Sequence, residues 1–127
     1  LKFSGAEYVA KAATSHAQDL ERKIKSALTR LPAFIEVLTP CNPSWGYDDD
    51  KGVEVTRLAV NCGMWPLYEW KDGVFSRQNI PRKATLRDYV GSQRRYAHLT
   101  DKDIQLMGEY VHDLDGMLSK LERAFTA

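Results

Sequence analysis

Residues 38–68 read LTPCNPSWGYDDDKGVEVTRLAVNCGMWPLY, and this stretch decides the fold of the chain. An apolar segment, residues 33–38 (AFIEVL), leads into a loop that holds Cys41 between two prolines. An acidic run, an amphipathic segment and an aromatic-rich segment follow. We expect these parts to form, in order, a strand, a functional loop, a helix and a second strand.

The residues before the Cys41 loop predict a strand–helix–strand unit. Residues 33–38 are β-branched and aromatic and lie between two prolines, which is typical of a strand. Upstream, residues 7–11 predict a strand, and residues 19–28 predict a helix with apolar positions every three or four residues. Strand–helix–strand order is typical of a parallel sheet. The sequence therefore predicts an α/β fold with Cys41 beyond the carboxyl end of a strand, where such sheets gather ligand sites.

The acidic run at residues 48–50 has two interpretations. Residues 53–61 predict a helix that ends at Gly63, so the three aspartates fall at its N-terminus, where negative charge is favourable. The alternative is a cation site, although three adjacent aspartates lack the alternation of a calcium loop. The whole of 42–50 is expected to be loop.

The second half of the chain predicts a hairpin and short helical segments. Residues 65–70 predict a strand, and the Asp-Gly pair at 72–73 predicts the turn of a hairpin with residues 74–76. We expect a connector at 77–83 and a short helix at 85–90. The basic run at 93–96 is too short to indicate nucleic-acid binding, and we interpret it as a solvated face.

The last helix carries the clearest local signals. Thr100 and Asp103 form a capping box, and Leu99 with Ile104 forms a hydrophobic staple. An apolar stripe follows at three- and four-residue spacing. It consists of Ile104, Met107, Val111, Leu114, Leu118, Leu121 and Phe125. Two interpretations stay open: the helix docks on its own domain, or it packs against another subunit.

Composition excludes several classes of protein. The chain has 127 residues and a net charge of +1, so electrostatics favours neither nucleic acid nor a membrane surface as a partner. No apolar run reaches the roughly 18 residues that a membrane helix needs, and the first residues have no signal-peptide core. Leu1 is not an initiator methionine, which suggests a processed or cut chain. Two cysteines and no secretion signal favour a reduced, cytoplasmic setting.

Few residues can carry chemistry. The sequence has no glycine-rich phosphate loop, and its three histidines share no metal-ligand spacing. Cys41 and Cys62 are too far apart in sequence for a CxxC zinc site. Taken by itself, Cys41 is either a functional thiol or a small buried apolar side chain.

Several motifs decide between those alternatives. The chain resembles the beta (thiamine-diphosphate-binding) subunits of 2-oxoacid:ferredoxin oxidoreductases, above all the pyruvate type, over most of residues 5–100. The matching motifs are Pro40-Cys41, the turn Asn42-Pro43-Ser44-Trp45-Gly46, the helix core Arg57-Leu58-Ala59-Val60 and the segment Trp65-Pro66-Leu67-Tyr68-Glu69. Upstream, residues 5–10 (GAEYVA) also match, as do residues 89–99 downstream.

The resemblance implies a function. Enzymes of this family decarboxylate a 2-oxoacid on thiamine diphosphate with Mg²⁺, pass electrons through [4Fe–4S] clusters to ferredoxin and form acyl-coenzyme A. In the beta subunit four cysteines hold one cluster, three of them early in the subunit and the fourth in the Pro-Cys motif. Cys41 matches this fourth ligand, so we expect it to bind metal. No cluster role is expected for Cys62.

The departures from the family pattern define what kind of chain this is. The three early cysteines and the Gly-Asp-Gly segment that holds magnesium are absent. We therefore expect a C-terminal fragment, or one part of a split subunit, that binds no cofactor alone. Residues 1–99 would be the last part of the thiamine-diphosphate domain, an incomplete parallel sheet, and 100–127 an amphipathic docking helix.

The expected partners follow from this incompleteness. They are the remaining beta-subunit segment, other oxidoreductase subunits and ferredoxin. Apolar side chains left without cover, at Tyr8, Val9, Phe34 and Ile35, are expected to promote self-association. The alternative function is a non-catalytic beta-subunit remnant that acts as an interaction module through its last helix.

Overall fold

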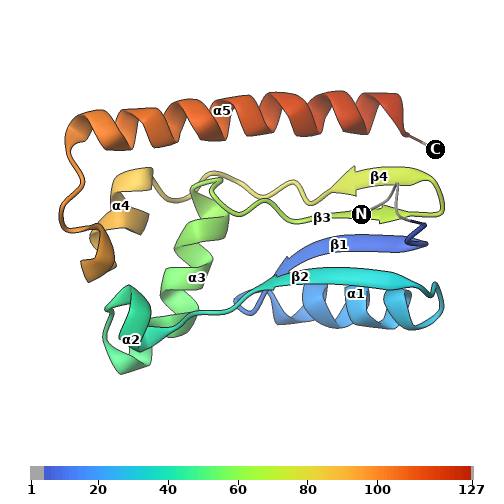
Figure 1. Ribbon diagram of the computed structural model, residues 1–127, viewed down its shortest axis with the longest axis horizontal. Coiled ribbons are helices and arrows are strands. Elements are labelled where there is room, and N and C mark those ends of the chain that lie inside the picture. The colour runs from blue at the N-terminus through green and yellow to red at the C-terminus, as the bar shows by residue number, and fades with distance from the viewer. Residues whose placement is uncertain (1–4, 127) are drawn as a thin grey trace.

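The computed structural model describes residues 5–126 and shows an α/β fold built on one sheet (Figure 1). Within these residues the sheet has four strands in the order β2-β1-β3-β4, with β1 in the centre. The chain visits β1 (Tyr8–Ala13), α1 (Ala17–Leu28), β2 (Ala33–Leu38), β3 (Tyr68–Lys71) and β4 (Val74–Arg77).

The sheet is mixed. Strands β1 and β2 are parallel and stay in register over six residue pairs, from Tyr8 opposite Ala33 to Ala13 opposite Leu38. This confirms the strand–helix–strand unit. The β1–β3 and β3–β4 pairs are antiparallel. Between β3 and β4 the chain reverses at the Asp72-Gly73 turn, with φ of 51° and 79°.

Several expected boundaries shift. The strand predicted at 65–70 begins only at Tyr68, because the Trp65 ring is held elsewhere and Pro66 has no N–H to donate. Trp65 donates its indole N–H to the Ala12 carbonyl at 2.8 Å. Helix α1 begins at Ala17, two residues earlier than predicted. Residues 42–50 are not all loop.

Helical segments follow β2. These are α2 (Asn42–Trp45), η2 (Asp49–Lys51), α3 (Gly52–Asn61), α4 (Leu86–Gly91), η3 (Arg94–Tyr96) and α5 (Asp101–Ala124). Helix α2 occupies part of the segment predicted as loop, so that prediction is wrong there; Pro43 is compatible with its first turn. Thr100 forms the two-way capping box that the sequence predicts, and Thr85 forms a second one at the start of α4.

Helix α1 packs on β1 and β2 and buries the apolar face that they share. Tyr8 and Ala10 pack there against Ala27. The expectation that Tyr8 lacks cover is wrong, because its ring is fully buried and its hydroxyl donates to Glu69 Oε2 at 2.5 Å. Phe34 remains 42% exposed, in agreement with the prediction.

Lys23 anchors α1 to the central strand. Its side chain is fully buried, and its Nζ donates to the Lys11 carbonyl at 2.8 Å and to Asp19 Oδ2 at 2.6 Å. Burial lowers the pKa of Lys23, whereas the hydrogen bond from its ammonium group to Asp19 opposes that shift. The apolar pattern predicted the helix but not this buried ion pair.

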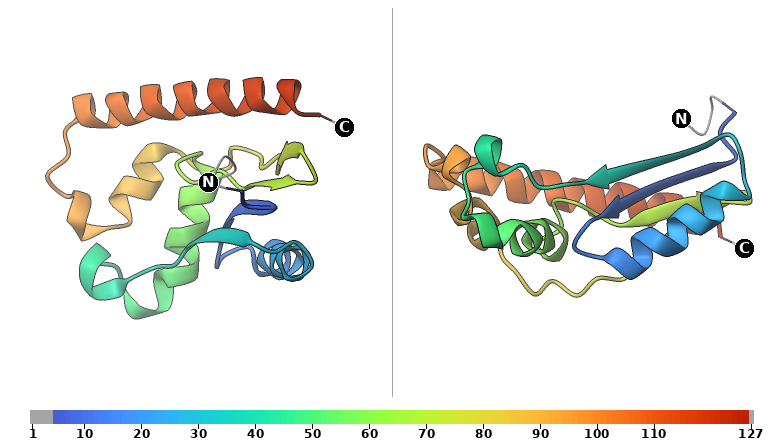
Figure 2. Two further views of the ribbon diagram at one scale, coloured as in Figure 1. Left: turned by 45° about the vertical axis from the view of Figure 1, so that its right-hand side comes forward. Right: turned by 90° about the horizontal axis from the view of Figure 1, so that it is seen from below.

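Helix α5 docks on its own chain, as the first of the two interpretations expects. Val111 and Leu118 on the predicted stripe are buried. At the C-terminal end of α5, the centre of the Phe125 ring lies 4.6 Å from the centre of the Trp70 ring. Figures 1 and 2 show α5 running along β4, with α1 next to β1 and β2. No helix within residues 5–126 is long and apolar enough to cross a membrane.

Candidate functional site

Cys41 follows β2 after Thr39 and Pro40, at the N-cap of α2. Its thiol-bearing side chain is exposed, and its backbone is extended at φ −130°. The Trp45 N–H donates to the Cys41 carbonyl at 2.8 Å, and the Gly46 N–H donates to the Asn42 carbonyl at 2.8 Å. The predicted position beyond the carboxyl end of a strand is confirmed, and one helical turn holds it.

Close packing supports the loop from behind. A side-chain carbon on Gly52 would lie 3.2 Å from Pro40 Cγ and 3.6 Å from the Tyr47 hydroxyl, so only a residue without Cβ fits there easily. Tyr47 is buried next to Cys41. Burial raises the pKa of Tyr47, and electrostatic interactions with Cys41 and Asp49 raise it further. The packing of Pro40, Tyr47 and Gly52 therefore supports the turn that holds Cys41.

A glycine with positive φ joins the other end of α2 to η3. Gly46 has φ +72°, a conformation that side chains disfavour, and a Cβ there would meet Arg94 Cβ at 2.8 Å. The Arg94 N–H donates to the Gly46 carbonyl at 2.8 Å. The Cys41 turn is thus fixed to a segment fifty residues later in the chain.

Arg95 completes this support and corrects a prediction. Its guanidinium lies 4.1 Å from the centre of the Trp45 ring and 4.5 Å from that of Tyr96. Its Nε donates to Gln93 Oε1 at 2.8 Å, and buried Gln93 donates from Nε2 to the Tyr89 carbonyl at 2.8 Å. The run at 93–96 is therefore not simply a solvated face. No local sequence signal pairs Arg95 with Trp45.

A cavity of about 320 Å³ lies between the β-strands and the Arg95–Trp45 contact. Leu38 and Trp45, which flank Cys41 in sequence, both line it. Lys11 reaches it with its Nζ 3.7 Å from the centre of the Trp65 ring, and burial lowers the pKa of Lys11. The other lining residues are Ala59, Met64, Tyr89, Arg95 and Tyr110. Aromatic walls and two cationic side chains are thus adjacent to the Cys41 turn.

Cys41 belongs to no group of three or more candidate metal ligands within residues 5–126. No group of three or more His, Cys, Asp or Glu side chains that could hold a metal ion is found there. The other thiol, Cys62, is buried at the end of α3 and contacts the Ala59 carbonyl at 3.5 Å. Burial raises the pKa of Cys62, which keeps it a protonated structural thiol. An iron–sulfur cluster normally takes four ligands, and the described residues offer it one exposed thiol.

The acidic run lies where the helix interpretation expects it. Residues 48–50 lead through η2 into α3. Asn42 donates from Nδ2 to Asp49, and Lys51 pairs with Glu54 at 3.3 Å. The run therefore serves the start of α3 and ties it to the Cys41 turn.

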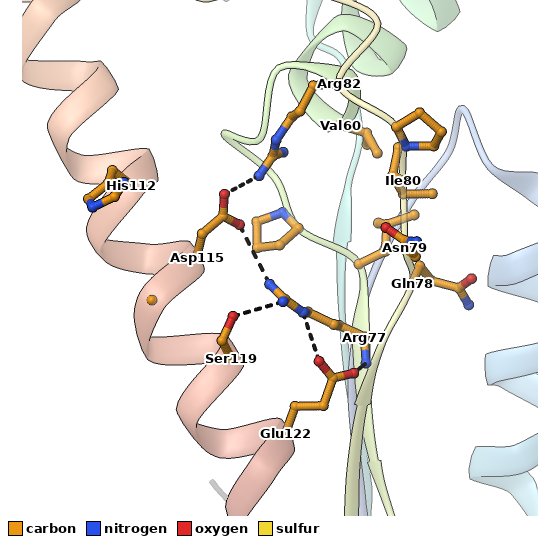
Figure 3. Close-up of a pocket in the computed structure, with 14 residues that line it drawn as sticks. Val60, Arg77, Gln78, Asn79, Ile80, Arg82, His112, Asp115, Ser119 and Glu122 are labelled. Carbon is orange, nitrogen blue, oxygen red and sulfur yellow. Dashed lines mark hydrogen bonds and ion pairs between the residues drawn. The ribbon is translucent and has the colours of Figure 1, made fainter.

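A larger cavity, about 800 Å³, lies between α5 and the segment after β4. Figure 3 shows Asp115, Ser119 and Glu122 of α5 pointing toward Arg77 and Arg82. Arg77 pairs with Glu122 at 3.0 Å and with Asp115 at 3.7 Å, and it donates to Ser119 at 2.8 Å. Arg82 also pairs with Asp115. Because these charged side chains pair with one another, we interpret them as an ion-pair network that holds α5 against β4 and the segment after it.

Comparison with known proteins identifies the family. No family model matches the chain. It is 44% identical over 111 residues to pyruvate synthase subunit PorB of Methanocaldococcus jannaschii, and the match covers 86% of this chain and 37% of that subunit. It is 30% identical over 123 residues to ketoisovalerate oxidoreductase subunit VorB of Pyrococcus furiosus, which covers 93% of this chain and 39% of the subunit.

The chain is a homologue of 2-oxoacid:ferredoxin oxidoreductase beta subunits. A second PorB, from Methanothermobacter thermautotrophicus, is 39% identical over 109 residues, or 84% of this chain. These matches confirm the resemblance that the Pro40-Cys41 and Trp65–Glu69 motifs indicate. The beta-subunit homologue spans less than two-fifths of the length of these curated relatives.

Proposed function

We propose that this chain is part of the beta subunit of a 2-oxoacid:ferredoxin oxidoreductase, in which Cys41 is one of four ligands of a [4Fe–4S] cluster. The observation that carries the proposal is an exposed thiol, held on a packed turn beyond β2, in a homologue of PorB and VorB. The other three thiolates would come from the part of the relatives that this chain does not span.

The residues around Cys41 fit one corner of such a site. A bound cluster would supply one-electron transfer. The chain's own contribution is to hold one sulfur in place, because Pro40, Gly52 and Tyr47 support the turn from below. Arg95 and Trp45 fix its far end. A site pre-positioned in this way needs little rearrangement when the remaining ligands arrive.

The complete enzyme would oxidatively decarboxylate pyruvate or a related 2-oxoacid to acyl-coenzyme A and reduce ferredoxin. Thiamine diphosphate and Mg²⁺ would serve it, and in this proposal they would be held by the part of the relatives that this chain does not span. Partners would be that part, further subunits and ferredoxin, in the cytoplasm. Residues 1–99 would complete the cofactor domain, and 100–127 would form the docking helix.

The test is Cys41→Ser in the assembled oxidoreductase, with Cys62→Ala as the matched control. We expect Cys41→Ser to lower the iron content and the rate of ferredoxin reduction, because serine is a poor substitute for a thiolate ligand. Cys62→Ala should leave the iron content unchanged, because that thiol is buried in the core. Unchanged iron and unchanged activity in Cys41→Ser would contradict the proposal.

A second candidate is a non-catalytic beta-subunit remnant that binds a partner through α5. It is favoured by three exposed apolar side chains, Leu106, Tyr110 and Met117, which recur on one side of the helix. Met117→Asp would then abolish a stable complex without unfolding the chain, whereas Lys120→Asp, on an adjacent exposed position, would not. A complex that survives Met117→Asp would reject this alternative.

A further inference from the structure

We propose that Arg95 positions the Cys41 turn through Trp45, and that its fixed positive charge favours the reduced state of a cluster bound there. This inference rests on the proposed cluster role of Cys41 and assigns to this chain a residue that adjusts the reduction of that cluster. Three observations carry it: the guanidinium is held from several sides, it lacks a carboxylate partner, and it lies on the helical turn that Cys41 caps.

Several contacts fix the position of the Arg95 guanidinium. It lies over two aromatic rings, 4.1 Å from the centre of Trp45 and 4.5 Å from that of Tyr96. Its Nε donates to Gln93 Oε1 at 2.8 Å, and its Nη2 donates to the Tyr89 hydroxyl at 3.3 Å. Gln93 is itself buried, with 3% of its surface exposed. Because a planar guanidinium is pre-organised for such contacts, the charge of Arg95 has a defined place in the structure.

No carboxylate pairs with this guanidinium among residues 5–126. Other cations of the chain do have such partners, as Arg77 has in Glu122 at 3.0 Å. The second cation that lines the 320 Å³ cavity, Lys11, has Glu36 at 3.8 Å from its Nζ. A half-buried charge without a counter-ion attracts a negatively charged group more strongly than one that is already paired. Arg95 is therefore suited to stabilise negative charge at the neighbouring turn.

Trp45 connects this charge to Cys41. The Trp45 N–H donates to the Cys41 carbonyl at 2.8 Å, so one helical turn, about 6 Å along the axis, separates the two residues. Helical side chains lean toward the N-terminus of their helix, which directs the Trp45 ring back toward the Cys41 end. Since Arg95 lies on that ring, its charge is on the order of 10 Å from the Cys41 thiol by this helical geometry.

Electrostatics gives the direction and the size of the effect. A [4Fe–4S] cluster with four thiolate ligands is negatively charged, and its negative charge grows by one on reduction. A nearby fixed cation therefore stabilises the reduced state more than the oxidised state. At about 10 Å and an effective dielectric constant of about 20, one unit charge changes the ratio of reduced to oxidised cluster roughly tenfold. For a one-electron couple, a tenfold change is about 59 mV.

Asp49 places a charge of the opposite sign beside the same turn. Asn42, the residue after Cys41, donates from its Nδ2 to Asp49. Burial, and after it electrostatic interactions with Cys41 and Asp49, raise the pKa of Tyr47, which agrees with these groups lying close together. Asp49 is exposed, so water and salt screen its charge more than that of half-buried Arg95. It should therefore disfavour reduction, by less than Arg95 favours it.

A redox titration of the assembled oxidoreductase, followed by electron paramagnetic resonance, tests the role of Arg95. The cluster signal to follow is the one that Cys41→Ser abolishes. At the potential where this cluster is half reduced in the parent enzyme, we expect the ratio of reduced to oxidised cluster in Arg95→Gln to be roughly tenfold lower. Arg123→Gln removes the same charge from an exposed position near the far end of α5 and should match the parent (Figure 1). A parental ratio in Arg95→Gln would overturn the proposal.

The sign of the shift separates charge from packing. Asp49→Asn keeps an oxygen that accepts from Asn42 but removes the negative charge, so it should raise the ratio about two- to threefold. A mere loosening of the turn would move both variants in the same direction. Shifts of the same sign in Arg95→Gln and Asp49→Asn would therefore overturn the electrostatic role.

Arg95→Lys decides if Arg95→Gln also loses iron. Lysine keeps the positive charge but cannot reproduce the planar contacts with Trp45 and Tyr96. A ratio within about threefold of the parent in Arg95→Lys supports the role of the charge. A tenfold fall in that variant would overturn it.

Failure of this inference can be told apart from failure of the cluster role. Loss of iron in Cys41→Ser together with a parental ratio in Arg95→Gln would contradict the role of Arg95 alone. Unchanged iron in Cys41→Ser would contradict the cluster role itself, whatever the Arg95 variants show.

Discussion

The two edge strands of the sheet, β4 and β2, differ in what lies against their outer sides. At β4, the outward N–H of Phe75 donates to the Phe125 carbonyl at 2.9 Å, and that of Arg77 reaches Glu122 Oε1 at 3.5 Å. Both acceptors belong to the end of α5. At β2, no further strand of the described residues lies along the outer edge. The chain closes one edge of its sheet with its own last helix and leaves the other edge available.

The difference explains the length of α5. Its 24 residues reach from the capping box at Thr100 to the carbonyl that caps β4. Covering an edge with a helix is one of the usual protections against aggregation. On the other side of the sheet, β2, which leads to the candidate ligand Cys41, is the last strand within residues 5–126.

The largest effect is expected where α1 holds the β1–β2 side together. Asp19→Ala leaves the buried ammonium of Lys23 without its partner, so we expect a loss of about 3–5 kcal/mol in the free energy of unfolding. Urea denaturation measures it. Glu21→Ala, which breaks the exposed pair with Lys25, is the control and should cost about 0.5 kcal/mol or less. Similar losses for both variants would mean that the Lys23–Asp19 pair has no special role.

The next effect concerns the closed edge. Leu118 is 2% exposed, and Leu118→Ala should destabilise the chain by about 2–4 kcal/mol through the cavity that it leaves. As α5 loosens, the Phe75 and Arg77 amides should exchange faster, which converts a closed edge into an open one. Met117→Ala, one position earlier and 52% exposed, should change neither quantity. Unchanged exchange at Phe75 in Leu118→Ala would show that α5 does not protect β4.

Signals confined to a few neighbouring residues predicted most of the fold. The capping box at Thr100, the Asp72-Gly73 turn and the β2 pattern are each decided by local chemistry, and all are present in the structure. The sheet order could not be predicted in this way, because it depends on which strands meet across sixty residues.

The candidate site also has features that local sequence predicted and features that depend on residues far apart in the chain. The placement of Cys41 after a strand followed from the proline-bounded apolar run. The support given by Arg95 to Trp45 was missed, because fifty residues separate the partners and a short basic run is usually solvated. The covered state of Tyr8 was missed as well, since it depends on α1 packing and on Glu69. The ligand role of Cys41 stays a prediction.

The smallest effect is a pH dependence at the start of α5, the helix that closes the β4 edge. The backbone N–H of Thr100, and then its hydroxyl, donate to Asp103 and lower the pKa of that carboxyl. A carboxyl whose pKa is lower in the folded than in the unfolded chain stabilises the fold at neutral pH. That contribution is lost as the pH falls from the ordinary carboxyl range through the folded pKa. Asp103→Asn, which does not titrate, should lose less stability than the parent chain between pH 7 and pH 3 in urea denaturation. Asp113→Asn, an exposed aspartate on the same helix, should keep the parent dependence, and an Asp103 variant that also kept it would place the acid sensitivity elsewhere.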